Sequence, residues 1–519
     1  MEFELLNFLL KVYHYASWLI NCHYIRKFRH LQYNSYSMRV LSTIIFLLVS
    51  TCWSIAQPGY KIEFKINGWK DTTVYLGYSF WDQTYIKDTA KVNSQGAFFF
   101  DGSKTLPQGM YFLVLSQSKI FDFVIGNDQQ FNLETSNEDY IRNVKLTGDE
   151  DNKLFFENMT FNMERHKEAE PFIKILQDST LAKDDPAKKT AQESFSKVNE
   201  KVMAYQNQLI AKYPTTLTAR LLKSSKQIEI PGPPKKADGS IDSTFQFRYY
   251  REHFFDNFDL ADEALLRLPK VIYKDKVKEY LERLFVPDPD TITRAIIKLA
   301  DKAKKNQETY KYLVWNCLVN YQAPEIMGLD RVYVNLYDKY YASGEMDFWI
   351  NSTVKKNIKD YAEKLRGSLV GDQGRNLKMQ DQNLQPKSLY DIKKKYTFIF
   401  FYDPDCGHCR EETPKLVEFY NKNKVKFDLE IFAVSADTSL QKMKDFTKEF
   451  KINWITVNGP RSYIGSYSNL YYAEQTPTLY ILDSKKKIIA KKPPIDKLED
   501  FLTSYEKFQK LKQAPAKGT

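Results

Sequence analysis

Apolar and polar residues alternate along the chain from about residue 60, which is the pattern of half-buried β-strands. The alternating apolar positions are Tyr60, Ile62, Phe64 and Ile66, then Val74, Leu76, Tyr78 and Phe80. Four further short runs (GAFFFDG, MYFLVL, FDFVIG and FNLET) are separated by turn residues. The pattern predicts an N-terminal antiparallel β-sandwich over residues 58–149. We expect its aromatic residues to fill the core and the sheet faces, and not to form a ligand platform.

Beyond Asp149 the apolar residues recur every three or four positions, which predicts amphipathic helices. The clearest examples are Phe195, Val198, Val202, Tyr205 and Leu209, and then Ile292, Ile296 and Leu299. Asp290 is expected to cap the second of these helices. The spacing predicts a central all-α domain over residues 150–367, without a repeat of fixed length. His253 and Cys317 lie in it with no second ligand or nucleophile partner nearby in sequence, so we expect both to be structural.

A third pattern opens the C-terminal part of the chain. The apolar run KYTFIFFY, residues 395–402, predicts a buried strand, and Glu411, Leu416 and Phe419 continue on a helical spacing. Between them lies the sequence CGHC, residues 406–409. These elements predict an α/β domain over residues 368–519, and the chain is therefore expected to be multidomain.

Composition supports several cores, because 43% of the 519 residues are hydrophobic and 15% are aromatic. The net charge of +11 comes partly from short lysine runs such as 393–395 and 485–487. No arginine-rich block or nucleic-acid motif accompanies these runs, so we interpret them as solvated faces and expect no nucleic-acid partner.

The first 57 residues resemble a leader. Met38 and Arg39 precede the apolar run VLSTIIFLLVSTCW, and Ser54 and Ala56 stand at an A-x-A-like cleavage position, which predicts a signal peptide over residues 38–56. The run is shorter than the ~20 residues of a membrane span. Residues 1–37 are interpreted as an over-extended gene start. Lipid attachment at Cys52 is not favoured, because Thr51 stands where a bacterial lipobox normally has Gly, Ala or Ser.

The C-x-x-C pair carries the candidate chemistry. Cys406 is expected at a helix N-terminus, where unpaired backbone N–H groups and the helix dipole stabilise a thiolate. Cys409 is close enough for its sulfur to reach that of Cys406, so a mixed disulfide at Cys406 can be resolved within the molecule. Zinc is a weaker alternative, since no second C-x-x-C or H-x-x-x-H pair completes four ligands. A structural disulfide is also weaker, because so small a loop constrains the unfolded chain little. No metal and no cofactor are predicted.

Three features together resemble the thioredoxin superfamily over residues 368–512: the strand before CGHC, Pro414 five residues after Cys409, and EQTPTLYILD near the end. The segments SLYDIKKKYTFIFFY and FDLEIFAVSADTSLQKMKDFTKEF resemble the TlpA/ResA-like envelope branch. The resemblance implies that the Thr476–Pro477 peptide bond is cis, packs against the cysteine turn and offers backbone groups to a substrate strand. Gly407 and His408 complete the implied site. An N-terminal sandwich followed by a helical domain is similar to the domain order of exported proteins of this type.

The chain also departs from the family. Asp405 stands where many members have Trp, and it adds a negative charge beside Cys406; Phe400 stands where thioredoxin buries an aspartate that assists proton transfer. Lys486 occupies the usual glycine of a hairpin, at an expected cost of ~1 kcal/mol for a positive φ. We interpret His408 as a residue that helps stabilise the Cys406 thiolate. The alternative is a solvent-facing helix residue with no effect on the cysteine.

These observations favour an exported thiol-disulfide oxidoreductase in the periplasm or cell envelope. Its expected partners are protein thiols or disulfides of the envelope and an upstream membrane or periplasmic electron partner. The alternative is an envelope binding or scaffold protein whose thioredoxin-like module is redox-inert. A thiol peroxidase is disfavoured, because the pattern P-x-x-x-T/S-x-x-C does not precede Cys406.

Overall fold

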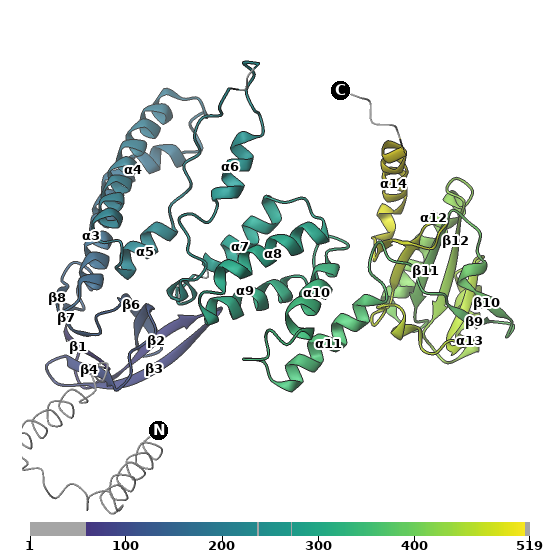
Figure 1. Ribbon diagram of the computed structural model, residues 1–519, viewed down its shortest axis with the longest axis horizontal. Helices are drawn as coiled ribbons and strands as arrows, with labels where there is room; N and C mark the ends of the chain where they lie inside the picture. Colours follow the sequence, from purple (N-terminus) through teal and green to yellow (C-terminus); the bar gives the residue numbers. More distant parts are fainter. Residues whose placement is uncertain (1–58, 236–237, 271, 514–519) are drawn as a thin grey trace, which may run out of the picture. The chain divides into compact units, whose positions relative to one another are not determined.

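A computed structural model describes residues 59–235, 238–270 and 272–513, and it contains three successive regions of different architecture (Figure 1). The first is built of β-sheets, the second of helices, and the third of a mixed sheet with helices. The multidomain fold class predicted from the sequence is therefore confirmed. The predicted signal peptide and Cys52 lie outside the described residues.

The N-terminal region consists of two four-stranded sheets, with strand orders β4-β1-β7-β8 and β3-β2-β5-β6. Buried rings of Phe64 and Phe123, one from each sheet, meet edge to face at 5.4 Å. The strands are β1 (Tyr60–Asn67), β2 (Thr72–Phe80), β3 (Gln83–Val92), β4 (Ala97–Gly102), β5 (Gly109–Leu115), β6 (Ser118–Ile125), β7 (Gln130–Ser136) and β8 (Lys145–Thr147). The aromatic residues of this region thus provide much of its core, as expected.

One strand pair departs from the antiparallel expectation. Strands β1 and β7 run parallel, with Ile62 opposite Phe131 and Phe64 opposite Leu133. Parallel neighbours need a long connection, and here β2 to β6 supply it: β2, β3, β5 and β6 form the other sheet, and β4 lies beside β1. Alternation of apolar residues identifies strands but does not fix their direction, which is why the sequence did not predict this pair.

The middle region begins at α3 (Glu150–Gln177), and its other helices are α4 (Pro186–Lys212), α5 (Leu217–Ser224), α6 (Phe245–His253), η2 (Glu263–Leu266), α7 (Ile272–Arg283), α8 (Pro289–Ala303), α9 (Gln307–Asn320), α10 (Asp330–Leu336), η3 (Tyr337–Ala342) and α11 (Ser352–Arg366). The expected cap of α8 was wrong by two residues: the Asp288 side chain, and not that of Asp290, accepts a hydrogen bond from Thr291 N–H. Pro289 explains the shift, since its fixed φ suits the first helical position.

Cys317 of α9 is 1% exposed, and burial raises its pKa to about 12, which suppresses its thiolate.

The C-terminal region contains one seven-stranded sheet in the order β10-β9-β13-β12-β11-β14-β15. Strands β11, β12 and β13 are parallel, and β14 is antiparallel to β11. The elements are β9 (Lys378–Asp381), β10 (Pro386–Ser388), η4 (Leu389–Asp391), β11 (Tyr396–Tyr402), α12 (Gly407–Asn423), β12 (Leu429–Ser435), α13 (Leu440–Glu449), β13 (Ile455–Ser462), η5 (Tyr467–Asn469), β14 (Thr478–Leu482), β15 (Ile488–Lys491), η6 (Ile495–Lys497) and α14 (Leu498–Gln513). Among the described residues of the chain, no helix is both long enough and apolar enough to cross a bilayer.

Strand β11 is buried along its whole length because apolar residues cover both faces of the sheet. Phe398 and Phe400 belong to a core that also contains residues of α12 and α14. Ile399 and Phe401 point into a second core with Tyr471 and neighbouring residues. A continuous apolar run is what such a two-sided strand requires.

Lys486 shows how a sequence departure is accommodated. Its φ is +62°, so the expected left-handed conformation is present. The side chain is only 6% exposed, and its Nζ donates hydrogen bonds of 2.7 Å to the Ile392 carbonyl oxygen and to Thr397 Oγ1. A glycine at this position could not supply that donor. The buried hydrogen bonds therefore offset the backbone cost.

Candidate active site

The turn between β11 and α12 carries both cysteines of the CGHC sequence. Strand β11 ends at Tyr402, and Cys406 is the N-cap residue of α12 with an extended backbone (φ −76°, ψ 120°). This placement directs the backbone N–H groups of the first helical turn toward the Cys406 side chain. The strand–turn–helix arrangement expected from the sequence is present.

The two sulfur atoms occupy different environments. Cys406 is partly exposed, and its thiol donates to the Thr476 carbonyl oxygen over 3.4 Å. Cys409 is 0% exposed, and the Asp403 N–H donates to its sulfur over 3.4 Å. Both residues are free thiols here, so the structure shows the reduced form. Solvent and an incoming partner therefore reach Cys406 and not Cys409.

The same environments separate the acidities of the thiols. Partial burial opposes the Cys406 thiolate, but hydrogen bonds from the Cys409 N–H and thiol outweigh it and lower the pKa of Cys406. Burial raises the pKa of Cys409 to about 12. The Cys406 thiol is thus the more acidic of the two, and the Cys409 thiol is held protonated.

The other predicted site residues surround Cys406 to different degrees. The Thr476–Pro477 peptide bond is cis, and the Thr476 carbonyl group contacts the Cys406 sulfur. Gly407 is the first residue of α12, and apart from its neighbours in the helix no described residue lies within 4 Å of the place that a Cβ would occupy, so packing does not demand glycine. The His408 side chain is 83% exposed, with Nδ1 3.5 Å from Glu411 Oε2. It lies on the solvent face of the helix.

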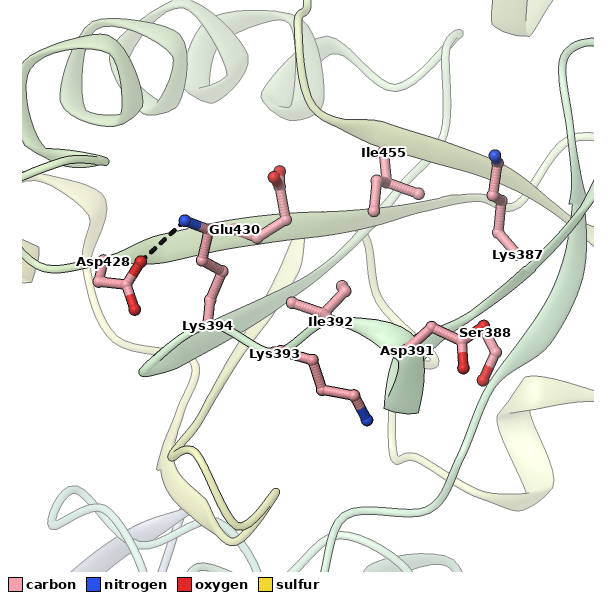
Figure 2. A pocket seen from close by; sticks show the side chains of 9 residues that line it. All are labelled: Lys387, Ser388, Asp391, Ile392, Lys393, Lys394, Asp428, Glu430 and Ile455. Atoms are coloured by element: carbon pink, nitrogen blue, oxygen red, sulfur yellow. Dashed lines mark hydrogen bonds and ion pairs between the residues drawn. The ribbon is translucent and has the colours of Figure 1, made fainter.

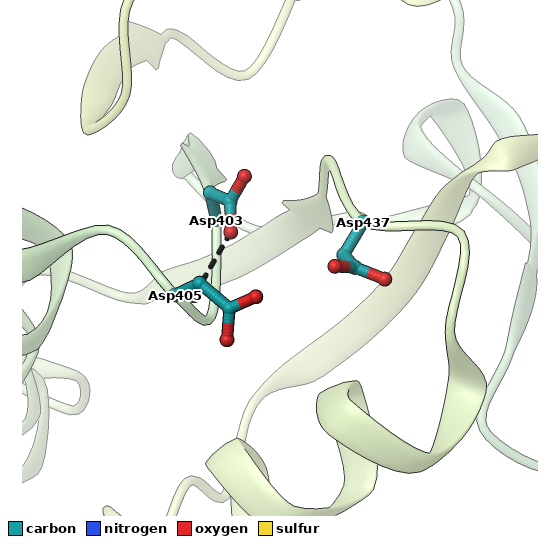
Figure 3. A group of neighbouring side chains, drawn as sticks. All are labelled: Asp403, Asp405 and Asp437. Atoms are coloured by element: carbon teal, nitrogen blue, oxygen red, sulfur yellow. Dashed lines mark hydrogen bonds between the residues drawn. The ribbon is translucent and has the colours of Figure 1, made fainter.

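Phe400 replaces the buried carboxylate of thioredoxin with an aromatic ring. It is 1% exposed and stacks on Tyr402 at 5.7 Å between ring centroids. The carboxylates near the cysteines lie elsewhere: Asp403 and Asp405 in the turn itself, and Asp437 after β12. Oxygen atoms of these three side chains lie within 4.8 Å of one another (Figure 3).

Sequence reasoning missed one member of this group, Asp437, and also its partner Lys442. Lys442 Nζ lies 2.5 Å from Asp405 Oδ2 and 3.1 Å from Asp437 Oδ2. The parallel order of β11 and β12 brings the two turns together, because carboxyl ends of parallel strands meet at one edge of a sheet. That order was the signal that could have found Asp437.

A pocket of about 400 Å³ opens at the other edge of the sheet, by the amino ends of β11 and β12 (Figure 2). Its lining includes Lys393, Lys394, Asp428 and Glu430. Lys394 pairs with Asp428 at 2.8 Å, and Glu430 accepts a hydrogen bond from the Tyr420 hydroxyl. Because Cys406 follows the carboxyl end of β11, this pocket is no part of the cysteine site.

Comparison with known families identifies the C-terminal region. Residues 370–491 match the family described as AhpC/TSA, so this part of the chain is a thioredoxin-like domain and the resemblance seen in the sequence is confirmed for it. Residues 60–155 and 186–364 match two domains of unknown function, DUF4369 and DUF5106.

The chain is also similar to individual proteins. A tryparedoxin of Trypanosoma brucei brucei is 29% identical over 98 residues, which are 19% of this chain and 67% of the relative. A domain of a possible thiol-disulfide isomerase from Cytophaga hutchinsonii is 37% identical, with a TM-score of 0.26, over 28% of this chain and 97% of that structure. A thioredoxin-like protein from Bacteroides caccae is 19% identical, with a TM-score of 0.43, over 54% and 99% respectively.

The two thiols are expected to react in a fixed order. Because its pKa is lowered and its sulfur is accessible, Cys406 of the reduced protein should be alkylated first by iodoacetamide at about pH 6.5. Cys409 should remain unmodified until the protein is unfolded. Peptide mass spectrometry after timed quenching measures both sites, and a fully denatured sample is the control. Earlier alkylation of Cys409 would exchange the two roles.

Proposed function

We propose that this protein is an exported thiol-disulfide oxidoreductase, in which Cys406 is the nucleophile and Cys409 the resolving cysteine. The observation that carries the proposal is the unequal pair of thiols: an accessible Cys406 with a lowered pKa at the start of α12, and a buried Cys409 with a raised one. The thioredoxin-like domain matched over residues 370–491 supports the same reading.

The proposed reduction of a partner disulfide takes two steps. The Cys406 thiolate attacks one sulfur of that disulfide, which forms a mixed disulfide and releases the other partner sulfur as a thiolate. Cys409 then loses its proton and attacks the Cys406 sulfur, which closes the Cys406–Cys409 disulfide and releases the second partner thiol. The partner gains two electrons and the protein loses two. Run in reverse, the same steps oxidise a dithiol.

The second step needs the Cys409 proton to leave a buried site. Phe400 cannot accept it, since its side chain is apolar and lies in the core. Asp403 is an acidic residue whose backbone N–H contacts the Cys409 sulfur. Thr476 lies against Cys406, so a partner strand that pairs with this segment would place its sulfur beside the nucleophile.

The proposed partners are thiols or disulfides of envelope proteins, together with a membrane or periplasmic redox protein that restores the starting state. Each turnover changes the oxidation state of the Cys406–Cys409 pair, so a second redox protein is required to return the pair to its starting state. The cysteine pair itself carries the electrons, and the proposal includes no cofactor or metal.

A redox titration tests this function. Equilibrated with glutathione buffers, the protein should convert reversibly between dithiol and disulfide, with a midpoint between about −270 mV and −180 mV, the values of thioredoxin and protein disulfide isomerase. The Cys409→Ser variant should form a long-lived mixed disulfide at Cys406 instead. Alkylation followed by mass spectrometry measures both forms. A pair that does not cycle in this range would favour the alternative of a binding or scaffold protein with an inert module.

His408 is proposed to stabilise the Cys406 thiolate and so to favour the dithiol. The His408→Pro variant should then have a more negative potential by some tens of millivolts, where 30 mV corresponds to ~1.4 kcal/mol. The same glutathione titration measures the difference. An unchanged or less negative potential would assign His408 to the solvent-facing alternative, in agreement with its 83% exposed side chain.

Export is proposed from the apolar segment between Met38 and Ala56. Native protein isolated from the source cells should begin near Gln57, because cleavage after the small residue Ala56 removes the signal peptide. N-terminal sequencing of the mature protein, with cell fractionation, measures this. A cytoplasmic protein that retains residues 1–37 would contradict both the localisation and the choice of envelope partners.

A further inference from the structure

The turn that holds the nucleophile also carries an unusual concentration of negative charge. Asp405 directly precedes Cys406, and its carboxylate lies within 4.8 Å of those of Asp403 and Asp437 (Figure 3). The Asp405 N–H donates to Asp403 Oδ1 over 2.9 Å, which fixes the turn. Negative charge beside a cysteine disfavours its thiolate. Left alone, this group would oppose the chemistry that the helix N-terminus supports.

Lys442 of α13 supplies the opposite charge. Its Nζ contacts Asp405 Oδ2 at 2.5 Å and Asp437 Oδ2 at 3.1 Å. These hydrogen bonds raise the pKa of Lys442 to about 12, and the bond to Asp405 has the larger effect. The ammonium group therefore stays charged at neutral pH. Asp437 is held in place by the Ser439 N–H, which donates to its Oδ1 over 2.6 Å. The lysine therefore meets a preformed pair of carboxylates.

Other charged groups near Cys406 are paired among themselves. His408 faces Glu411 on the solvent side of α12, and Arg410 pairs with Glu449 of α13 while it donates to the Pro404 carbonyl oxygen. From the segment before β14, Thr476 presents a neutral carbonyl group to the sulfur. Burial and the Asp403 carboxylate raise the pKa of Tyr467.

We propose that Lys442 is a positioning residue of the cysteine site, which neutralises Asp405 and thereby preserves the reactive thiolate of Cys406. The lysine does not touch the reacting sulfur and acts through the carboxylate next to it. The inference deepens the proposed function and rests on it. This chain has Asp405 where many family members have Trp, and Lys442 of α13 supplies the positive charge that keeps Cys406 reactive.

The test compares alkylation rates of Cys406 as a function of pH in the full-length reduced protein. In the Lys442→Met variant the rate at about pH 6.5 should fall about two- to fivefold, the range expected for loss of a solvent-exposed ion pair. The wild-type and variant rates should converge at high pH, where Cys406 is a thiolate in both. Lys442→Arg should restore the wild-type profile because it returns the charge.

Two further variants separate charge compensation from a merely structural role. Lys444→Met removes an equal charge from an exposed position of the same helix and should leave the profile unchanged. In an Asp405→Asn background, Lys442→Met should have less than half of its effect in the wild type. Equal effects of Lys442→Met and Lys444→Met, or an undiminished effect in the Asp405→Asn background, would overturn the proposal.

The outcome is distinct from that of the redox titration. Alkylation of Cys406 reports the thiolate whether or not the protein cycles, so a redox-inert protein would refute the proposed function and leave this measurement valid. A protein that cycles normally while Lys442→Met has a wild-type alkylation profile would refute only the role of Lys442.

Discussion

The burial of strand β11 on both faces is the constraint on which the site depends. Every residue from Tyr396 to Tyr402 is buried, and the strand lies between β12 and β14 near the middle of its sheet. Truncating one such aromatic side chain to alanine typically costs about 3–5 kcal/mol. Burial of this kind specifies the register of the strand, and the turn that follows it places Cys406 at the start of α12.

The turn combines opposing electrostatic effects in a small space. Backbone N–H groups at the start of α12 favour a thiolate at Cys406, and burial disfavours one at Cys409. Asp405 acts against the first effect, and its ion pair with Lys442 moderates that action. No charged neighbour is needed to make the pKa of Cys409 differ from that of Cys406, since exclusion of water from Cys409 is sufficient. Asymmetry of the pair thus arises mainly from the fold.

The two preceding regions are organised by packing, with little sign of chemistry in the residues described. Their cores are rich in aromatic rings, and Cys317 is buried with a raised pKa that suits a small apolar residue. His253 pairs with Asp256 and stacks on Tyr249 at the surface. Both regions match domains of unknown function.

The sequence by itself determined the features that depend on neighbouring residues. The periods of two and of three to four marked the sheet and helical regions, the run KYTFIFFY marked a two-sided strand, and the spacing of Cys406 and Cys409 marked the chemistry. Local periodicity is sufficient for these because each side chain's face follows from its position along one element. The cis peptide bond before Pro477 was predicted from the family resemblance and not from the pattern.

Tertiary structure alone decided the parallel pairing of β1 with β7, the acceptors of the Lys486 ammonium group, and the meeting of Asp405 with Lys442. Each joins residues far apart in the chain, and no local pattern records which distant turns a given order of strands will bring together.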